Sequence, residues 1–126
     1  MSSEPLGILL ISGTHERAHY AFVLAAGAAA LGRRVVLFAT NDGCQALCTD
    51  WSALQESGRD ANLRSRGVAG IGELRDSAVE LGVRLIACES GMRVAALDAV
   101  RLLPGVEVAG VASFLEACSG GQILTL

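Results

Sequence analysis

Five short apolar runs of strand length recur along the chain, and segments of helical period separate them. The runs lie at residues 6–12, 35–40, 83–87, 106–111 and 122–126. The first run is apolar throughout, which is typical of a strand covered on both faces of a sheet. Because parallel neighbours need a crossover between them, the alternation predicts an α/β fold: a three-layer α/β/α sandwich with a mainly parallel five-stranded sheet.

Two of the separating segments have clear helical patterns. Residues 15–31 are apolar almost all round, with Thr14 as the expected N-cap and Gly32 as the expected stop. We expect the sheet to cover one side of this helix and a neighbouring subunit to cover another. Residues 71–81 have an ordinary amphipathic pattern, with Arg75 among the polar residues expected to face outward.

The other separating segments are less regular. Residues 51–67 are polar and follow no clean period, so we expect a mobile connection or lid over the strand ends. We also expect the domain to fold when residues 53–64 are deleted. Asp42 is the expected cap of a short helix that follows the second strand. Ser113 and Glu116 have the spacing of a capping box and predict the start of the last helix.

Composition limits the size of the domain and the kind of partner. A chain of 126 residues forms one domain, residues 1–126, with a sizeable core. Apolar residues make up 52% but aromatic residues only 4%, so the core is built mainly from Ala, Val, Leu and Gly. So much apolar surface on a small domain favours an oligomer. The net charge of −3 and the scattered basic residues argue against a nucleic-acid partner.

The residue types that are missing exclude several functions. All ten basic residues are arginine, which excludes a P-loop lysine and a Schiff-base lysine. The four cysteines form no CxxC pair and neither histidine has a cysteine nearby, so we expect no metal and no cofactor. The start of the chain lacks secretory features, and the longest apolar run, residues 21–32, is too short to span a bilayer. We therefore expect a cytoplasmic protein with no membrane span.

Cys88 is the main candidate for chemistry, because it stands where the third predicted strand stops. Ser90 is placed to cap the next helix, whose N–H groups and dipole would favour a thiolate. Glu89 opposes that effect and Arg93 supports it, so the sequence leaves the direction of the pKa shift open. A buried, inert cysteine is the alternative. A Cys-x5-Arg phosphate loop is not matched, because Arg93 falls one position short.

Other reactive residue types also follow strands. Cys44 and Cys48 come after the second strand and could resolve a persulfide or disulfide, although a packing role is the commoner one at this spacing. Cys118, inside the last predicted helix, is expected to be structural. His15 follows the first strand and could relay a proton, while a solvated surface histidine is the more common case.

Several stretches of the chain are similar to the DsrE/DsrF-like family of small sulfur-relay proteins, which includes TusD-related proteins. In the second half they are GVRLIACESGMRVAAL and LLPGVEVAGVASFLEA. In the first half the stretch is HYAFVLAAGAAALGRRVVLFAT, which resembles the family's alanine-rich helix and second strand. The resemblance covers most of the chain except about residues 44–66. NDGCQALC, residues 41–48, replaces an aromatic and glycine-rich run of the most similar branch.

The resemblance implies a persulfide carrier, or a sulfurtransferase-type protein, in which Cys88 takes up sulfane sulfur and passes it to a partner. It implies that Gly91, Met92, Ala112 and Ser113 lie in the loops beside this cysteine. Ser90, as the expected helix cap, and Gly13 and Thr14, at the end of the first strand, complete the candidate binding residues. It also implies sulfur donors and acceptors as partners and a homo-oligomer, a trimer or hexamer. One alternative is a non-catalytic oligomeric binding module with an inert cysteine. A flavodoxin-type enzyme is disfavoured because phosphate-loop and flavin-stacking residues are missing.

Overall fold

A computed structural model describes residues 4–126, and it contains the predicted five-stranded sheet. The strands are β1 (Leu6–Leu10), β2 (Val35–Ala39), β3 (Arg84–Cys88), β4 (Glu107–Ala109) and β5 (Gln122–Thr125). All pair in parallel, in the order β4-β3-β2-β1-β5. The fold class expected from the apolar runs is confirmed.

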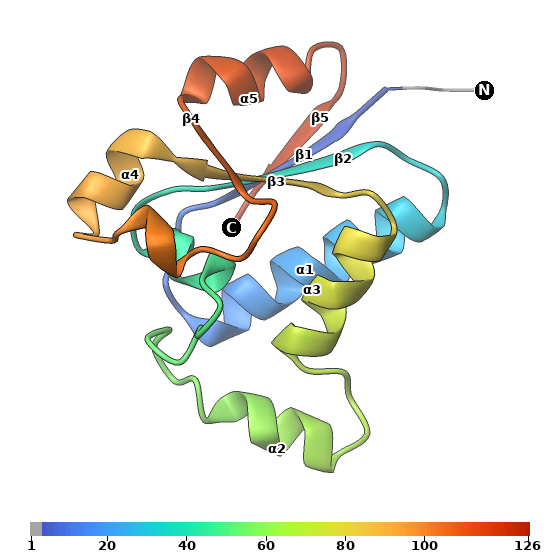
Figure 1. The fold of residues 1–126 in the computed structure, drawn as a ribbon. Helices are drawn as coiled ribbons and strands as arrows, with labels where there is room; N and C mark the ends of the chain where they lie inside the picture. The colour runs from blue at the N-terminus through green and yellow to red at the C-terminus, as the bar shows by residue number, and fades with distance from the viewer. Residues whose placement is uncertain (1–3) are drawn as a thin grey trace.

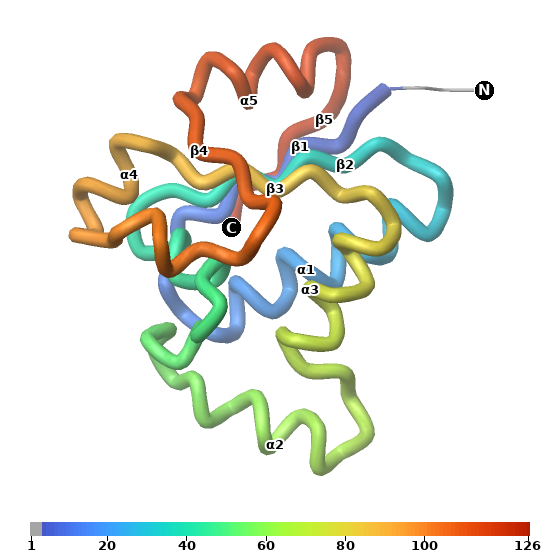
Figure 2. The backbone as a smooth tube through the Cα atoms, viewed as in Figure 1, coloured from blue at the N-terminus to red at the C-terminus, as the bar shows by residue number. Residues whose placement is uncertain are grey.

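Helices fill every connection between successive strands. The α-helices are α1 (His15–Ala30), α2 (Arg59–Ser65), α3 (Ile71–Glu80), α4 (Glu89–Val94) and α5 (Val111–Ala117). Two 3₁₀ segments, η1 (Asn41–Leu47) and η2 (Ala99–Arg101), follow β2 and α4. Figure 2 shows the path of the backbone, with α2 lying outside the layer formed by α1 and α3.

The handedness of the crossovers explains the layers. From β1 to β4 each strand is added on the same side of the one before it, so right-handed crossovers place α1 and α3 on one face of the sheet. The return from β4 to β5 crosses the sheet in the opposite direction, and it places α5 on the other face. Figure 1 shows α1 and α3 below the sheet and α5 above it.

The long helix α1 is covered on two sides by its own chain. Thr14 is the N-cap, as expected, and its side chain accepts a hydrogen bond from the Arg17 N–H. Gly32 follows the helix with a positive φ of 86°. α1 packs against both the sheet and α3. The small side chains of α1 let α3 lie against a second side of the helix, and the expectation that a neighbouring subunit also covers α1 stays a prediction.

The single helix α5 covers a smaller core on the opposite face. That core consists of Val36, Phe38, Ile86, Cys88, Phe114 and Cys118. The rings of Phe38 and Phe114 stack with centroids 4.9 Å apart. α5 begins at Val111 after Gly110, so the expected capping box of Ser113 and Glu116 is wrong. Ser113 lies in the first turn, because the helix starts directly at the end of β4.

Residues 51–67 are not the irregular lid that their polarity predicts. They include α2, and Leu54 and Asp60 are buried. One carboxylate oxygen of Asp60, Oδ1, accepts a hydrogen bond from the Ile71 N–H at the start of α3 and lies 2.8 Å from His15 Nε2. The prediction failed because a single buried carboxylate anchors the segment, and such an anchor leaves no periodic pattern.

Arg75 also differs from its expected place on the outer face of its helix. It is buried, and its Nη1 donates hydrogen bonds to the carbonyl oxygens of Ala46 at 2.9 Å and Cys48 at 2.6 Å. These carbonyls lie at the end of η1. The guanidinium therefore ties α3 to η1.

Candidate functional site

Cys88 is the last residue of β3, at the carboxyl edge of the sheet. It is in register with Ala109, the last residue of the neighbouring strand β4. The connection that leaves β3 passes Leu97 and Leu102, which belong to the core on the α1 and α3 side, whereas the connection that leaves β4 is α5 on the other side. Adjacent strands whose connections diverge in this way form the crevice where open α/β sheets bind ligands.

The thiol of Cys88 itself caps α4. Its Sγ accepts a hydrogen bond from the Gly91 N–H at 3.4 Å. Ser90 was expected to be the cap, but the structure places it inside the first turn, with its hydroxyl oxygen 3.3 Å from the sulfur. The helix starts one residue after the strand, so the cysteine occupies the position expected for the serine.

The pKa of Cys88 lies below its ordinary value. Burial acts to raise this pKa, because the side chain is only 6% exposed. The hydroxyls of Ser90 and Thr40 and the N–H groups of Gly91 and Ser90 outweigh burial, because they donate to the negative charge of a thiolate. Glu89 and Arg93 are exposed, and Arg93 Nη2 lies 4.0 Å from Glu89 Oε1. Their opposite charges offset each other, so the pair adds no net charge near the Cys88 sulfur.

Thr40 is a functional candidate that the sequence reasoning missed. It is the first residue after β2, the strand that pairs with β3. Its hydroxyl donates a hydrogen bond to Asn41 Oδ1 at 3.4 Å. The same hydroxyl can donate to the Cys88 sulfur when the thiol ionises. The one local signal was a hydroxyl residue directly after an apolar run, but the sequence did not indicate that this strand lies next to the cysteine strand.

Gly91 allows the hydroxyl of Thr40 to reach the sulfur. A Cβ at this position would collide with Thr40 Oγ1 and the Asn41 backbone nitrogen. Only a glycine therefore lets α4 approach the end of β2 this closely. Met92 was expected beside the cysteine, but its side chain is buried in the core on the α1 and α3 side, where it anchors α4.

The other three cysteines are buried and hold their protons. Burial raises the pKa of Cys44 to about 12 and also raises the pKa of Cys48 and Cys118. The Cys44 thiol donates to the Ala39 carbonyl oxygen at 3.4 Å, and the Cys48 thiol faces the Cys44 carbonyl oxygen at 3.8 Å. All four cysteines are buried, so these thiols differ from Cys88 in the direction of their pKa shift.

The remaining residues expected at the site lie on neighbouring strand ends. Ala112 and Ser113 are exposed in the first turn of α5, directly after the β4 end beside Cys88. Gly13 and Thr14 follow β1, which β2 separates from the cysteine strand. The Gly13 carbonyl accepts a hydrogen bond from the Gln55 N–H at 2.9 Å. Residues 51–67 therefore lie against the carboxyl end of β1.

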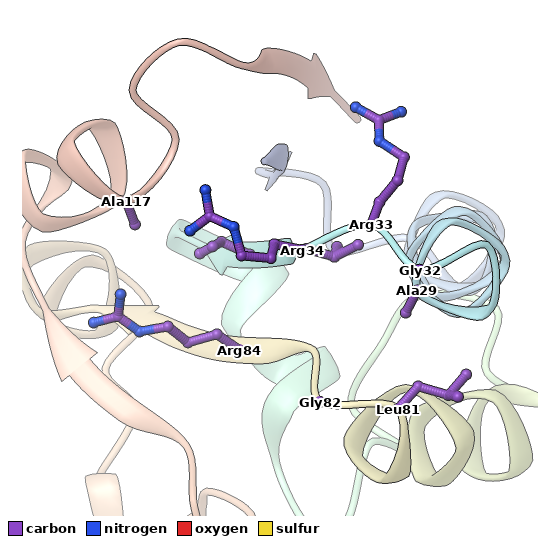
Figure 3. A pocket seen from close by; sticks show the side chains of 10 residues that line it. Ala29, Gly32, Arg33, Arg34, Leu81, Gly82, Arg84 and Ala117 are labelled. Carbon is purple, nitrogen blue, oxygen red and sulfur yellow. The ribbon is translucent and has the colours of Figure 1, made fainter. Parts of the chain in front are cut away.

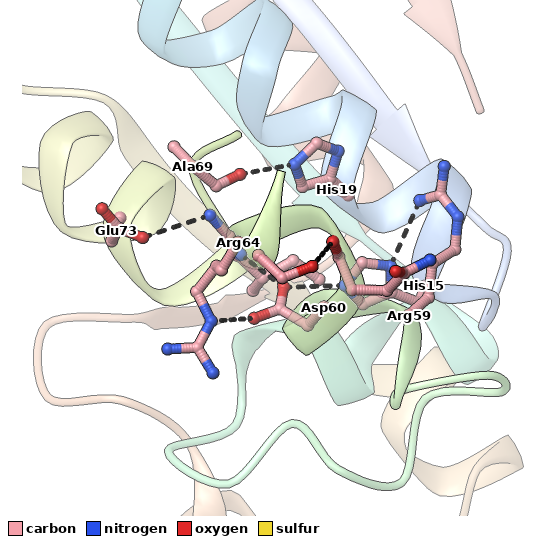
Figure 4. A network of polar contacts seen from close by, with 11 residues as sticks. His15, His19, Arg59, Asp60, Arg64, Ala69 and Glu73 are labelled. Atoms are coloured by element: carbon pink, nitrogen blue, oxygen red, sulfur yellow. Dashed lines mark hydrogen bonds and ion pairs between the residues drawn. The ribbon is translucent and has the colours of Figure 1, made fainter. Parts of the chain in front are cut away.

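His15 is buried, not solvated as the commoner case suggested. Its Nε2 lies 2.8 Å from Asp60 Oδ1, and its Nδ1 lies 3.4 Å from Arg59 Nη1 (Figure 4). Because a guanidinium can only donate, Nδ1 is the acceptor and Nε2 carries the proton that Asp60 accepts. Arg64 faces the other Asp60 oxygen at 3.5 Å. Burial of both His15 and Asp60 makes this pair a structural anchor.

A basic hollow lies at the opposite edge of the sheet. It measures about 480 Å³, and Arg33, Arg34 and Arg84 are among the residues that line it (Figure 3). Arg33 and Arg34 directly precede β2, and Arg84 begins β3. The hollow is therefore separated from Cys88 by the length of the strands, and it does not contribute to the site at the carboxyl edge.

Comparison with known proteins agrees with this arrangement. The sequence model described as the DsrE/DsrF/DrsH-like family matches residues 50–125, which contain Cys88 and the end of β4 beside it. The chain belongs to this family. Sulfur carrier protein DsrE2 from Allochromatium vinosum is 28% identical, over 98% of both chains. The uncharacterized protein YrkE of Bacillus subtilis is also 28% identical, over 92% of both chains.

Solved structures of related fold extend over nearly the whole chain. The YchN protein from E. coli superposes with a TM-score of 0.74 at 16% identity and covers 98% of this chain and 99% of its own. A protein of unknown function from Methanobacterium thermoautotrophicum, MTH1491, gives 0.58 at 21% identity, over 97% and 98%. These similarities show the fold alone. No helix within residues 4–126 is long and apolar enough to cross a membrane.

Proposed function

We propose that this DsrE/DsrF-like protein is a sulfur carrier in which Cys88 binds sulfane sulfur as a persulfide and relays it to a partner. The observation that carries the proposal is the set of hydroxyl and N–H donors around the Cys88 sulfur, which lower its pKa in spite of burial. The relative named sulfur carrier protein DsrE2 supports the same role.

The transfer needs no oxidant, because sulfur moves between thiols. The Cys88 thiolate attacks the outer sulfur of a donor persulfide, a new S–S bond forms, and the donor thiolate leaves with the electrons of the broken bond. In the second step an acceptor thiolate attacks the outer sulfur of the Cys88 persulfide, and the Cys88 thiolate leaves. A low pKa helps both steps at neutral pH, because it supplies the attacking anion and improves the leaving group.

The residues around Cys88 take separate parts in this proposal. Ser90, Gly91 and Thr40 hold the anion, while the exposed Ala112 and Ser113 border the path of an approaching donor. Gly13 and Thr14 belong to the same edge of the sheet and would contact a partner protein there. The partners are donor and acceptor proteins or small sulfane-sulfur compounds, and the relay operates in the cytoplasm.

We also propose that the protein is a homo-oligomer, a trimer or hexamer. Val111 and Leu115 lie one turn apart on α5 and are 55% and 53% exposed. Such an apolar helix face is often covered by another subunit. Sedimentation velocity measures the state directly, and a monomer at micromolar concentration would contradict this part of the proposal.

The test of the carrier role is sulfur loading followed by mass spectrometry. After incubation with polysulfide or glutathione persulfide, the intact mass should gain one sulfur atom, and peptide mapping should place it on Cys88. Cys88→Ser should abolish loading without changing the melting temperature, because the exchange is nearly isosteric. Cys118→Ser, which changes a buried thiol of α5 in the same core, is the matched control and should load normally.

The alternative is an oligomeric module with an inert cysteine. The small exposed fraction of Cys88 favours it. Failure to load from any donor, together with slow alkylation of Cys88 at neutral pH, would replace the carrier with this alternative.

A further inference from the structure

The basic hollow at the amino edge of the sheet gathers charges that are far apart in the sequence. Arg33 and Arg34 come directly before β2, and Arg84 begins β3. Three of the ten arginines of a chain with a net charge of −3 thus line one hollow of about 480 Å³. Among residues 4–126, no acidic residue lines it. The hollow is therefore a region of positive charge on an acidic protein.

The same kind of turn delivers two of these arginines. α1 and α3 are each followed by a glycine with a positive φ, 86° at Gly32 and 85° at Gly82. Arg34 and Arg84 stand two residues after these glycines. Because the two strands are neighbours and parallel, the two turns place both arginines at the same edge of the sheet.

Arg34 and Arg84 also project on the same face of the sheet. Alternate residues of a strand face the same side, so Arg34 follows Val36 and Arg84 follows Ile86. Val36 and Ile86 belong to the core under α5. Figure 3 shows both arginine side chains extending toward Ala117 of α5, while Arg33 stands at the rim of the hollow.

The ends of the two helices do not require these guanidinium groups. The carbonyl oxygen of Ala28 in α1 accepts a hydrogen bond from the Arg33 N–H at 3.1 Å. In α3 the carbonyl oxygen of Ala78 accepts one from the Val83 N–H at 2.9 Å. Backbone groups thus close the last turn of each helix, and the arginine side chains are left for another partner.

Two of the guanidinium groups have donors available. Arg84 Nε and Nη2 donate to the Glu107 carboxylate at 2.6 and 2.8 Å. This pair holds the guanidinium in one orientation and leaves Nη1 for a ligand. Arg33 is exposed, and its side chain makes no hydrogen bond or ion pair with another residue of the described part of the chain.

We propose that this hollow binds a phosphate monoester of a small organic molecule. Such a phosphate has three terminal oxygens and about two negative charges at neutral pH, so several guanidinium groups can donate to it at once, in pairs of hydrogen bonds. Ala29, Val35 and Leu81 also line the hollow and suit an apolar body. Its volume falls within the range of about 300–1,000 Å³ that is usual for small-molecule sites. This site is separate from Cys88, so the proposal goes beyond the sulfur-carrier role.

The first measurement is calorimetric titration of the full chain with phenyl phosphate at about pH 7.5 and low salt, where the ester is mostly a dianion. Inorganic phosphate lacks the apolar body, phenol lacks the charge, and benzoate carries a carboxylate in place of the phosphate. We expect a Kd below about 1 mM for phenyl phosphate and at least roughly fivefold weaker binding of the other three. Benzoate that binds as tightly as phenyl phosphate would overturn the choice of a phosphate.

Variants of the arginines place the binding in the hollow. Arg34→Gln/Arg84→Gln should weaken phenyl phosphate binding by about tenfold or more, and Arg33→Gln by roughly threefold. Arg17→Gln/Arg66→Gln removes two charges from exposed arginines elsewhere and should keep the parent Kd.

A urea melt checks that each variant folds, which we expect because the Arg84–Glu107 pair is exposed and contributes little stability. If the double variant in the hollow does not fold, Arg33→Gln decides. An unchanged Kd in the variants of the hollow, or no binding of phenyl phosphate by the parent protein, would overturn the proposal. The titration involves no thiol chemistry, so its result is independent of whether Cys88 carries sulfur.

Discussion

The thiol of Cys88 combines burial with a lowered pKa, two properties that normally oppose each other. Burial alone raises the pKa of a thiol, as it does for Cys44, Cys48 and Cys118. The difference at Cys88 is the number of donors that converge on one sulfur from two neighbouring strand ends. Local hydrogen bonding, not exposure, therefore distinguishes Cys88 from the other three cysteines.

Thr40 offers a direct test at the scale of a single side chain. Thr40→Val removes a hydroxyl that stabilises the thiolate, so the pKa of Cys88 should rise and its alkylation at pH 7 should slow by roughly threefold to tenfold. The pH profile of iodoacetamide alkylation measures both effects. Thr40→Ser should keep the parent profile, as should Thr125→Val on the exposed strand β5. Equal alkylation rates in Thr40→Val and Thr40→Ser would show that the Thr40 hydroxyl does not stabilise the Cys88 thiolate.

Among the elements, α2 and the start of α3 depend on one carboxylate. Burial acts to raise the pKa of Asp60, but the Ile71 N–H and His15 outweigh it and hold that pKa below its ordinary value. Gly70 leaves the necessary room, because a Cβ there would lie 2.5 Å from Asp60 Oδ2. The segment that looked like a lid is thereby fixed between α1 and α3.

Asp60→Ala should lower the free energy of unfolding by about 3 kcal/mol, because it leaves the His15 Nε2–H and the Ile71 N–H buried without an acceptor. Urea denaturation measures this change. The depressed folded pKa means that the charged form stabilises the fold above about pH 4, and that this contribution is lost as the pH falls through the folded value. Asp60→Asn should therefore flatten the acid limb of the stability profile, while the exposed Asp76→Asn should not. An unchanged acid limb in Asp60→Asn would show that another group titrates there.

Sequence reasoning succeeded for elements whose signal is local. The apolar runs located all five strands, and Thr14 and Gly32 marked the ends of α1 because caps act within one turn. It failed for Asp60 and Arg75, whose partners lie 45 and 29 residues away along the chain. At the site, Cys88 could be found from its place after an apolar run. Thr40 required knowing which strand ends are neighbours.

For the whole molecule, α5 is the only helix within residues 4–126 that covers its face of the sheet. Its fit depends on Gly7 in β1, where a Cβ would lie 2.5 Å from Cys118 Sγ and 3.1 Å from the Phe114 ring. The same small core contains Cys88. The close packing of α5 on Gly7 therefore affects how α5 covers the face of the sheet whose core contains Cys88.

Gly7→Ala should push α5 outward and lower the free energy of unfolding by about 1–3 kcal/mol, as expected for overpacking. Gly27→Ala, in α1 where nothing lies within 4 Å of the added Cβ, should instead stabilise the protein by up to about 1 kcal/mol. Thermal and urea melts of both variants measure the difference. A Gly7→Ala protein as stable as Gly27→Ala would mean that α5 adapts to the added methyl group.

The strand order has a consequence for how the chain emerges from the ribosome. β1 pairs with β2 on one side, but its other neighbour is β5, the last strand to be synthesised. One edge of β1 therefore stays unpaired, with its backbone N–H and C=O groups free, until the segment that forms β5 has been translated. Such an edge attracts strands of other molecules. We expect nascent chains halted before Gln122 to depend on chaperones, and chains released after Thr125 to complete the sheet unaided.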